Sequence, residues 1–234
     1  MLCEWTELPS ELQTDEVRPY YEALKNKQIS LLMKRIFDVM ASATMLVVLS
    51  PVFLLLAIAI KLDSPGPVFY RQVRVTQYGK EFRIFKFRSM VQDADRGPLV
   101  TVDADCRITR VGKLIRKCRL DEICQLIDVL RGTMTFVGTR PEVPRYVAAY
   151  TPEMMATLLL PAGVTSLASI FYKDEDQLLA DAEDVDRIYT EVVLPGKMRY
   201  NLRAIECFSF LKDFQVLFMT VLAVLGKDYN KDKY

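Results

Sequence analysis

A long apolar run with a proline near its centre constrains this chain more than any other feature. Residues 39–60 (VMASATMLVVLSPVFLLLAIAI) carry no charge, and a helix of about 20 such residues can cross a bilayer. Ser50 and Pro51 stand near the middle of the run. A proline inside a helix lacks a donor N–H and clashes with the carbonyl four residues earlier, so we expect a kink there.

The charges around this run favour a re-entrant arrangement. The flanking basic residues are Lys34, Arg35, Lys61, Arg71 and Arg74. Because they lie on both sides, both ends have the basic character of cytoplasmic segments. The hydroxyl of Ser50 can satisfy a carbonyl that the proline leaves free. We therefore predict that residues 31–62 dip into one leaflet and return, each half being roughly 15–20 Å long. A kinked spanning helix is the alternative.

A second apolar stretch lies near the C-terminus, at residues 208–225 (FSFLKDFQVLFMTVLAVL). Lys212 and Asp213 interrupt it, and the uncharged part that remains is too short to span a bilayer. Gly226 follows and is a typical helix stop. We expect either a helix at the membrane interface or an ordinary core helix.

Composition limits the chemistry that the chain can perform. The 234 residues include 31 basic and 30 acidic side chains, five cysteines and no histidine. Without histidine, the commonest general base at neutral pH is missing. The cysteines show no paired spacing typical of a zinc site, so we read them as reduced and cytoplasmic. A net charge of +1 gives no support for nucleic-acid binding.

The rest of the chain divides into an N-terminal extension and a catalytic part. Residues 1–30 are acidic, contain no secretory signal and have an amphipathic pattern that suggests a partner-binding or dimer element. Residues 68–75 and 82–88 predict an antiparallel hairpin across a turn at residues 78–80. Residues 93–107 form a polar loop that could act as a lid. We assign residues 63–234 to a cytoplasmic catalytic domain with interfacial helices.

Two groups of charged residues suggest a phosphate site. Between Arg71 and Arg88 there are six basic side chains and one acid, a density that suits a di-anionic phosphate or anionic lipid headgroups. Arg116 and Arg140 follow later in the chain. The planar guanidinium group can hold phosphate oxygens through two parallel hydrogen bonds, although a single arginine is more often a solvated surface residue.

Asp121 and Glu122 open a predicted helix that Gly132 ends. Acids at such a position commonly cap a helix and favour its dipole. A carboxylate can also act as a covalent nucleophile toward phosphorus, and its neighbour can hold Mg²⁺. Because histidine is absent, this chemistry is available to the chain. Cys118 and Cys124 flank the pair, and we expect both to be small buried residues rather than nucleophiles.

Three segments together resemble the monotopic phosphoglycosyl transferases, also called bacterial sugar transferases. They are residues 34–75 (KRIFDVMASATMLVVLSPVFLLLAIAIKLDSPGPVFYRQVRV), residues 86–90 (KFRSM) and residues 112–142 (GKLIRKCRLDEICQLIDVLRGTMTFVGTRPE). The likeness extends from about residue 30 to about residue 228. It includes the Ser50–Pro51 break, which matches the family's re-entrant helix motif.

The resemblance implies a two-step reaction. Asp121 would attack the β-phosphate of a UDP-sugar, release UMP and carry the phosphosugar until polyprenyl phosphate accepts it. The remaining roles that it implies are Mg²⁺ binding by Asp121 and Glu122, phosphate binding by Arg116 and Arg140, shaping of the nucleotide pocket by Pro141, and lining of the site by Lys86 and Arg88. A metal beside the carboxylates would spread the charge of the diphosphate and stabilise the leaving UMP.

Some positions depart from the family pattern. They are Cys124 and Thr139 where proline is common, Thr133 where aspartate is common, and Ala162 within LPAGVTSLAS, which stands where RPGxTGxxQ is typical. The last departure bears on the choice of sugar or nucleotide. The chain has no room for the transmembrane bundle of longer relatives, so the resemblance implies the short form of the family.

The sequence predicts a predominantly helical α+β domain on a re-entrant membrane hairpin, with a small β element and interfacial amphipathic helices. We expect it on the cytoplasmic face of the bacterial inner membrane, in contact with inner-membrane lipid, and beginning glycan or exopolysaccharide assembly. A homodimer and downstream glycosyltransferases are further candidate partners. The competing hypothesis is a catalytically silent, membrane-anchored scaffold or a lipid-headgroup binder, and it predicts no UMP release.

Overall fold

The computed structural model describes residues 2–91, 107–173, 175 and 184–229. It is a mostly helical α+β fold, as predicted, and it contains two small sheets. The helices are α1 (Arg18–Lys25), α2 (Gln28–Val48), α3 (Ser50–Asp63), α4 (Arg110–Lys117), α5 (Leu126–Arg131), α6 (Pro144–Val147), α7 (Leu167–Phe171), α9 (Val185–Ile188), α10 (Leu194–Glu206) and α11 (Phe210–Val224). The strands are β1 (Phe69–Val75), β2 (Glu81–Phe87), β3 (Met134–Val137) and β4 (Ala162–Thr165).

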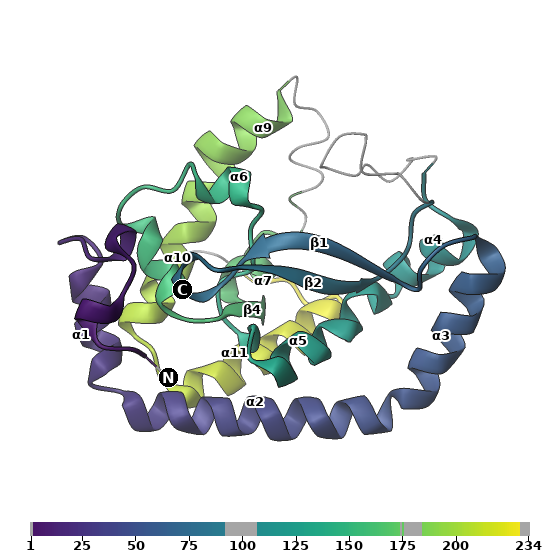
Figure 1. The fold of residues 1–234 in the computed structure, drawn as a ribbon, viewed down its shortest axis with the longest axis horizontal. Coiled ribbons are helices and arrows are strands. Elements are labelled where there is room, and N and C mark those ends of the chain that lie inside the picture. Colours follow the sequence, from purple (N-terminus) through teal and green to yellow (C-terminus); the bar gives the residue numbers. More distant parts are fainter. Residues whose placement is uncertain (1, 92–106, 174, 176–183, 230–234) are drawn as a thin grey trace.

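Short 3₁₀ and π-helical turns connect several of these elements in the described part of the chain. They are Trp5–Glu7, Ser10–Leu12, Gln77–Gly79, η5 (Leu120–Gln125), η6 (Met154–Leu159) and the π-helical turn Tyr189–Val193. Figure 1 shows α2 along one edge of the molecule, with α3 turning away from its end and the β1–β2 hairpin on the other side of α5. Except for Arg107, the loop expected to act as a lid lies outside the described residues.

The break between α2 and α3 has the predicted chemistry. The two helices meet at Leu49 and are bent by 60°. Pro51 cannot donate to the carbonyl of Val47, and the hydroxyl of Ser50 donates to that carbonyl instead, at 2.8 Å. By length and composition, no described helix could cross a membrane alone, whereas α2 and α3 together could. The first helix begins at Gln28, well before the apolar run, and is therefore longer than predicted.

Polar residues on one side of α2 attach it to the rest of the domain. The Lys34 ammonium group donates to the carbonyl of Val137 at 2.7 Å and pairs with Asp213 of α11 at 2.5 Å. Asp38 accepts hydrogen bonds from the Thr135 hydroxyl at 2.6 Å and from a backbone N–H of β3. Buried polar groups need such partners. One side of α2 is therefore fixed against β3 and α11.

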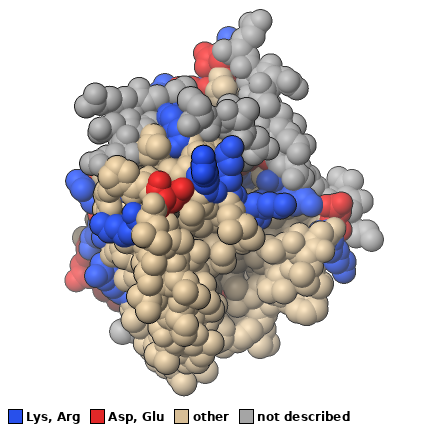
Figure 2. All heavy atoms as spheres, turned by 90° about the vertical axis from the view of Figure 1, so that its right-hand side faces the viewer, with Lys and Arg blue, Asp and Glu red and all other residues tan. Residues whose placement is uncertain are grey.

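Apolar residues cover the outward sides of α2, α3 and α11. The exposed ones include Ile29, Leu32, Met33, Ile36, Met40, Val47 and Val48 of α2, Leu54, Leu55, Ile58 and Leu62 of α3, and Leu211, Phe218, Val221 and Val224 of α11. Figure 2 shows an uncharged lower surface on this side of the molecule, below a belt of Lys and Arg. An apolar surface of this extent marks an interaction with a membrane or another protein.

The hairpin forms as predicted, and a second sheet was not predicted. β1 and β2 pair antiparallel, with Phe69 opposite Phe87. Aromatic rings of the two strands pack with Ile60 of α3 and Ile115 of α4. β3 and β4 form a two-stranded parallel sheet, with Met134 opposite Ala162. Each of these strands has four residues, and α6 and η6 separate them in the chain, so neither strand has a clear sequence pattern.

The N-terminal segment packs onto its own domain. Leu12, Val17, Tyr21 and Leu24 are nearly inaccessible to solvent and form one core with residues of η6 and α10. The Tyr20 hydroxyl also donates to the carboxylate of Glu153 at 2.7 Å. The amphipathic side that suggested a partner-binding element is therefore occupied within the same chain. The physical reason is that η6 and α10 offer it an apolar surface.

We predict that the N-terminal segment contributes to the stability of the whole domain. Leu24→Ala leaves a cavity in the shared core, so its free energy of unfolding should fall by about 2–5 kcal/mol. Chemical denaturation of the protein in detergent measures this change. Glu22→Ala, on the exposed side of α1, is the matched control and should unfold like the wild type. Equal stability of the Leu24→Ala variant would show that the segment is only loosely attached.

Candidate active site

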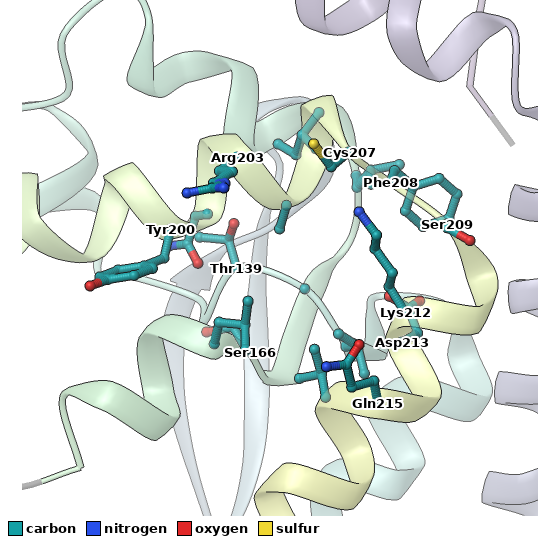
Figure 3. Close-up of a pocket in the computed structure, with 18 of the residues that line it drawn as sticks. Thr139, Ser166, Tyr200, Arg203, Cys207, Phe208, Ser209, Lys212, Asp213 and Gln215 are labelled. Atoms are coloured by element: carbon teal, nitrogen blue, oxygen red, sulfur yellow. The ribbon is translucent and has the colours of Figure 1, made fainter. Parts of the chain in front are cut away.

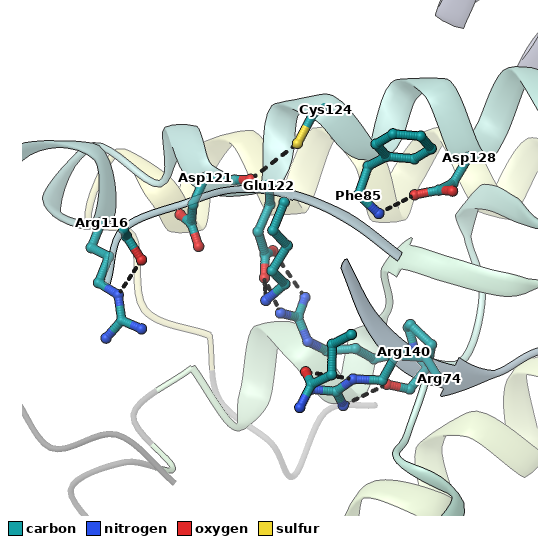
Figure 4. A network of polar contacts seen from close by, with 12 residues as sticks. Arg74, Phe85, Arg116, Asp121, Glu122, Cys124, Asp128 and Arg140 are labelled. Atoms are coloured by element: carbon teal, nitrogen blue, oxygen red, sulfur yellow. Dashed lines mark hydrogen bonds and ion pairs between the residues drawn. The ribbon is translucent and has the colours of Figure 1, made fainter. Parts of the chain in front are cut away.

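The carboxylate pair lies on a tight 3₁₀ turn and not in the first turn of an α-helix. After α4 the chain passes through Arg119, which has a left-handed backbone with φ of 51°. η5 then carries Asp121 and Glu122, and α5 follows without a gap. Gly132 ends α5 with φ of 87°, as predicted. The single helix expected here is thus split in two, and the split turns both carboxylates to one side (Figure 4).

Glu122 forms the centre of a network of ion pairs. The Lys86 ammonium group of β2 donates to Glu122 Oε1 at 2.9 Å. The Arg140 guanidinium group, which follows β3, donates to both carboxylate oxygens, with Nη1 lying 3.1 Å from Oε2. Burial alone would raise the pKa of Glu122, but Arg140 and Lys86 outweigh it and hold the pKa well below its usual range. Glu122 therefore stays ionised and holds three segments of the chain together.

Asp121 has a different environment from its neighbour. Its carboxylate has no hydrogen-bond or ion-pair partner in any other residue that the structure describes, and Figure 4 shows it pointing to the same side as Glu122. Burial raises the pKa of Asp121, and the negative charge of Glu122 adds to the effect, whereas Lys86 and Arg116 oppose it. A poorly solvated carboxylate without a partner is suited to nucleophilic attack. The two adjacent acids therefore have distinct environments.

The structure brings most of the predicted phosphate-binding residues to this side. Arg116 donates from Nε to the Ser89 hydroxyl at 3.0 Å, and its charge acts on Asp121. Lys86 and Arg140 contact Glu122 directly. Pro141 is buried beside Arg140. These cations surround the carboxylates in a way that suits a ligand with several phosphate oxygens.

Arg88 lies in a different environment from Lys86. Its guanidinium group donates to the Ser64 carbonyl at 2.7 Å and to the Pro65 carbonyl at 2.8 Å. It thereby fixes the end of α3. Alternation along a strand would place Lys86 and Arg88 on one face, but β2 ends at Phe87. The buried Arg88 thus holds the connection between α3 and β1 against the end of β2.

The sequence did not single out Arg74 as part of this site. Arg74 Nη1 donates to the Pro141 carbonyl at 3.0 Å, next to Arg140. Burial lowers the pKa of Arg74, and Gln72 accepts from its Nε and Nη2. In the sequence, Arg74 is only one of several basic residues in the hairpin. The tertiary structure shows its position, because it places Pro141 beside β1.

A buried cluster behind Pro141 was also missed. The Tyr189 hydroxyl donates to Glu142 Oε1 at 2.5 Å, and Lys197 lies 3.6 Å from that carboxylate oxygen and 3.0 Å from Glu175. Lys197 and Glu142 are only 6% and 7% exposed in their side chains. These residues come from separate segments, so no sequence motif joins them. The cluster supports the segment that carries Arg140.

The cysteines next to the carboxylate pair differ from each other. Cys124 is fully buried, and its thiol donates to the Asp121 carbonyl at 3.3 Å. Burial raises the pKa of Cys124, so its thiol is inert at neutral pH. Cys118, in contrast, is exposed, which corrects the expectation of burial. It follows the last residue of the amphipathic α4 and lies on its solvent side.

The donor set around the pair is compatible with Mg²⁺. A carboxylate offers about four acceptor positions. Lys86 and Arg140 use three of these positions at Glu122, while Asp121 keeps both oxygens available. The described residues contain no cluster of three or more acidic or thiol side chains. However, Mg²⁺ commonly binds to one or two carboxylates together with water and substrate phosphates, so Asp121 and the remaining position at Glu122 fit it.

Two larger hollows lie in the described part of the structure. A groove of about 460 Å³ runs between α2 and α11, and Glu122 and Arg140 are among the residues that line it. A separate pocket of about 280 Å³ lies between α10 and α11. Figure 3 shows Tyr200, Arg203 and Lys212 around this second pocket. The first hollow reaches the carboxylate network, whereas Asp121 and Glu122 do not line the second.

Comparison with protein families decides the classification of the chain. A family model described as bacterial sugar transferase matches residues 29–227. The chain belongs to the bacterial sugar transferase family. The matched region begins next to α2 and ends after α11, so it includes the broken helix, the basic hairpin and the carboxylate pair. The resemblance noted in the sequence is therefore confirmed for the family.

Individual relatives agree with this classification. The chain is 36% identical to the UDP-N-acetylgalactosamine-undecaprenyl-phosphate N-acetylgalactosaminephosphotransferase of Aeromonas hydrophila, over 82% of this chain and 43% of that protein. It is 34% identical to the UDP-glucose:undecaprenyl-phosphate glucose-1-phosphate transferase of Caulobacter vibrioides, over 84% of this chain and 71% of that protein. It is 34% identical to the exopolysaccharide production protein PSS of Rhizobium leguminosarum bv. phaseoli, over 85% of this chain and 98% of that protein. The chain thus spans less than half of the Aeromonas relative.

We predict that neutralising the two carboxylates of this family member has different effects on stability. Glu122→Gln removes the negative charge with which Lys86 and Arg140 pair. The free energy of unfolding should fall by about 1–3 kcal/mol at neutral pH, a modest value for an ion pair because Arg140 is partly exposed to water. Asp121→Asn removes a charge that burial disfavours, so this variant should be at least as stable as the wild type.

The pH dependence follows from the directions of the two pKa shifts. The pKa of Glu122 is lowered by folding, so its stabilisation is present above the unfolded pKa and is lost as pH falls through the folded pKa. The pKa of Asp121 is raised by folding. The ionised carboxylate therefore lowers the free energy of unfolding only as pH rises through the unfolded pKa. We therefore expect the free energy of unfolding of each variant, Glu122→Gln and Asp121→Asn, to approach that of the wild type in acid. Unfolding curves at several pH values measure this. Equal destabilisation by both variants would contradict this assignment.

Proposed function

We propose that this protein transfers a sugar 1-phosphate from a UDP-sugar to polyprenyl phosphate, here undecaprenyl phosphate, and releases UMP. The observation that carries the proposal is the contrast between the unpartnered Asp121 and the tightly held Glu122. It agrees with the names of the relatives, which describe transfer of a sugar phosphate to undecaprenyl phosphate. Such a reaction would be the first membrane step in the assembly of a glycan or exopolysaccharide.

The proposed reaction has two displacements at one phosphorus atom. Asp121 attacks the β-phosphorus of the UDP-sugar, the bond to the bridging oxygen breaks, and UMP leaves with the electron pair. An oxygen of polyprenyl phosphate then attacks the aspartyl phosphosugar and frees the carboxylate as the diphosphate forms. Lys86, Arg116 and Arg140 supply positive charge for the phosphate oxygens. Mg²⁺, when bound by Asp121 and Glu122, would reduce the charge repulsion against the attacking carboxylate.

We further propose that α2 and α3 form a re-entrant hairpin at the cytoplasmic face of the bacterial inner membrane. In this arrangement the Ser50–Pro51 break lies deepest in the leaflet, and α11 lies at the interface. Support comes from the 60° bend and from the apolar outward sides of these helices. Residues 63–234 then act as the catalytic domain, to which residues 1–30 are attached by the shared core.

The product formed from the nucleotide tests the proposed reaction. Purified protein in nanodiscs, given Mg²⁺, undecaprenyl phosphate and a panel of UDP-sugars, should release UMP with one or more of the donors. Asp121→Asn should lower this rate by about a thousandfold or more, because the nucleophile is lost. Cys118→Ser is the matched control on the same loop. Release of UDP would indicate ordinary glycosyl transfer. No nucleotide product from any donor, with a folded protein, would favour the scaffold hypothesis.

Labelling from each side of the membrane tests the re-entrant arrangement. In a cysteine-free background, Ile29→Cys and Leu62→Cys mark the outer ends of α2 and α3. Both thiols should react with a membrane-impermeant maleimide in inverted vesicles and remain protected in intact spheroplasts. A cysteine in place of exposed Glu22 serves as a cytoplasmic control. Labelling of the two helix ends from opposite sides would instead establish a kinked spanning helix.

A further inference from the structure

The groove between α2 and α11 is lined by a few charged residues and by many apolar ones. Its charged lining residues are Arg119, Glu122, Arg140 and Lys173, so positive charges outnumber negative ones. The rest of its lining is uncharged and includes Ala41, Met45 and Leu49 on the α2 side and Leu217, Val221 and Val224 on the α11 side. A ligand that fits this pattern has an anionic group joined to a long apolar portion.

Some of the apolar lining residues lie on the exposed side of the helix pair. Met45, Val221 and Val224 line the groove and are nevertheless 42%, 58% and 66% exposed. They adjoin the uncharged surface formed by α2, α3 and α11, which Figure 2 shows below the belt of Lys and Arg. An apolar chain can therefore enter from a membrane without crossing water.

The charged lining residues include members of the candidate active site. Glu122 and Arg140 line the groove and also form the ion-pair network beside Asp121. Gln125 lies in the same wall, is 1% exposed, and has no hydrogen-bond partner for either side-chain polar atom among the described residues. Such a buried amide is costly unless a ligand or water satisfies it. A nucleotide suits this groove poorly, since its ribose and base would face mainly apolar side chains.

We propose that this groove holds the isoprenoid chain of the polyprenyl phosphate acceptor, with its phosphate beside the lining residues Arg119, Gln125 and Arg140. The inference rests on the proposed function and deepens it by assigning the acceptor a site. The chain lies between α2 and α11, and the phosphate oxygen reaches the phosphosugar on Asp121 past Glu122. The donor nucleotide occupies the opposite side of the network, near Arg116.

Filling the groove should weaken use of the acceptor and spare the donor reaction. Ala41→Trp and Ala223→Trp each place an indole among the lining residues. The KM for undecaprenyl phosphate in nanodiscs should rise about tenfold or more, because the chain loses space. The single-turnover burst of UMP without acceptor should change by less than about twofold. Met40→Trp is the matched control, because Met40 is on the outward side of α2 and 66% exposed.

A binding measurement separates this inference from the proposed reaction. A photoreactive benzoylphenylalanine in place of Ala223 should form an adduct with undecaprenyl phosphate in phosphatidylethanolamine–phosphatidylglycerol nanodiscs, and one in place of Met40 should form much less. Adducts with phospholipid alone at Ala223, or an unchanged KM in both tryptophan variants, would overturn the inference. Absence of UMP from the wild type would instead contradict the proposed function, while the adduct would still report whether the groove binds the acceptor.

Discussion

The carboxylate of Glu122 is the constraint on which the rest of the candidate site depends. It accepts hydrogen bonds from Lys86 of β2 and from Arg140 after β3, so three separate segments meet at one half-buried charge. Taking these charges out of water is costly, and only their mutual pairing offsets that cost. Lys86 and Arg140 occupy most of the acceptor positions of Glu122. The structural role of Glu122 thus leaves Asp121 for the nucleophilic role that we propose.

The same principle governs the attachment of α2 and α3. Helix α2 has an apolar outward side, but Lys34, Asp38 and Ser42 are buried on its inward side. Lys34 bonds to β3 and α11, while Asp38 bonds to β3. A helix with this division can lie on a bilayer and still belong to the catalytic domain. At the other end of the hairpin, Arg88 fixes the last turn of α3, so both helices are coupled to the strands that carry the site.

Local chemistry was predictable from the sequence. Pro51 required a break, and the Ser50 hydroxyl satisfies the carbonyl that the proline leaves free. Gly132 and Gly226 end helices with positive φ angles, and the hairpin formed where alternating aromatic and basic residues indicated it. The combination of the broken apolar run with the Asp121–Glu122 pair also indicated the family, which the match over residues 29–227 confirmed. Each of these features depends on residues that are close in sequence.

Only the tertiary structure decided which charged residues meet. The sequence placed Lys86 and Arg88 together, but Lys86 pairs with Glu122 while Arg88 caps α3, because β2 ends between them. It did not indicate that Arg74 supports Pro141, nor that the amphipathic N-terminal segment covers η6 and α10. The short parallel pair β3–β4 was missed for the same reason. Spacing and composition encode backbone conformation locally, whereas burial and long-range pairing select among equivalent side chains only when the whole chain is packed.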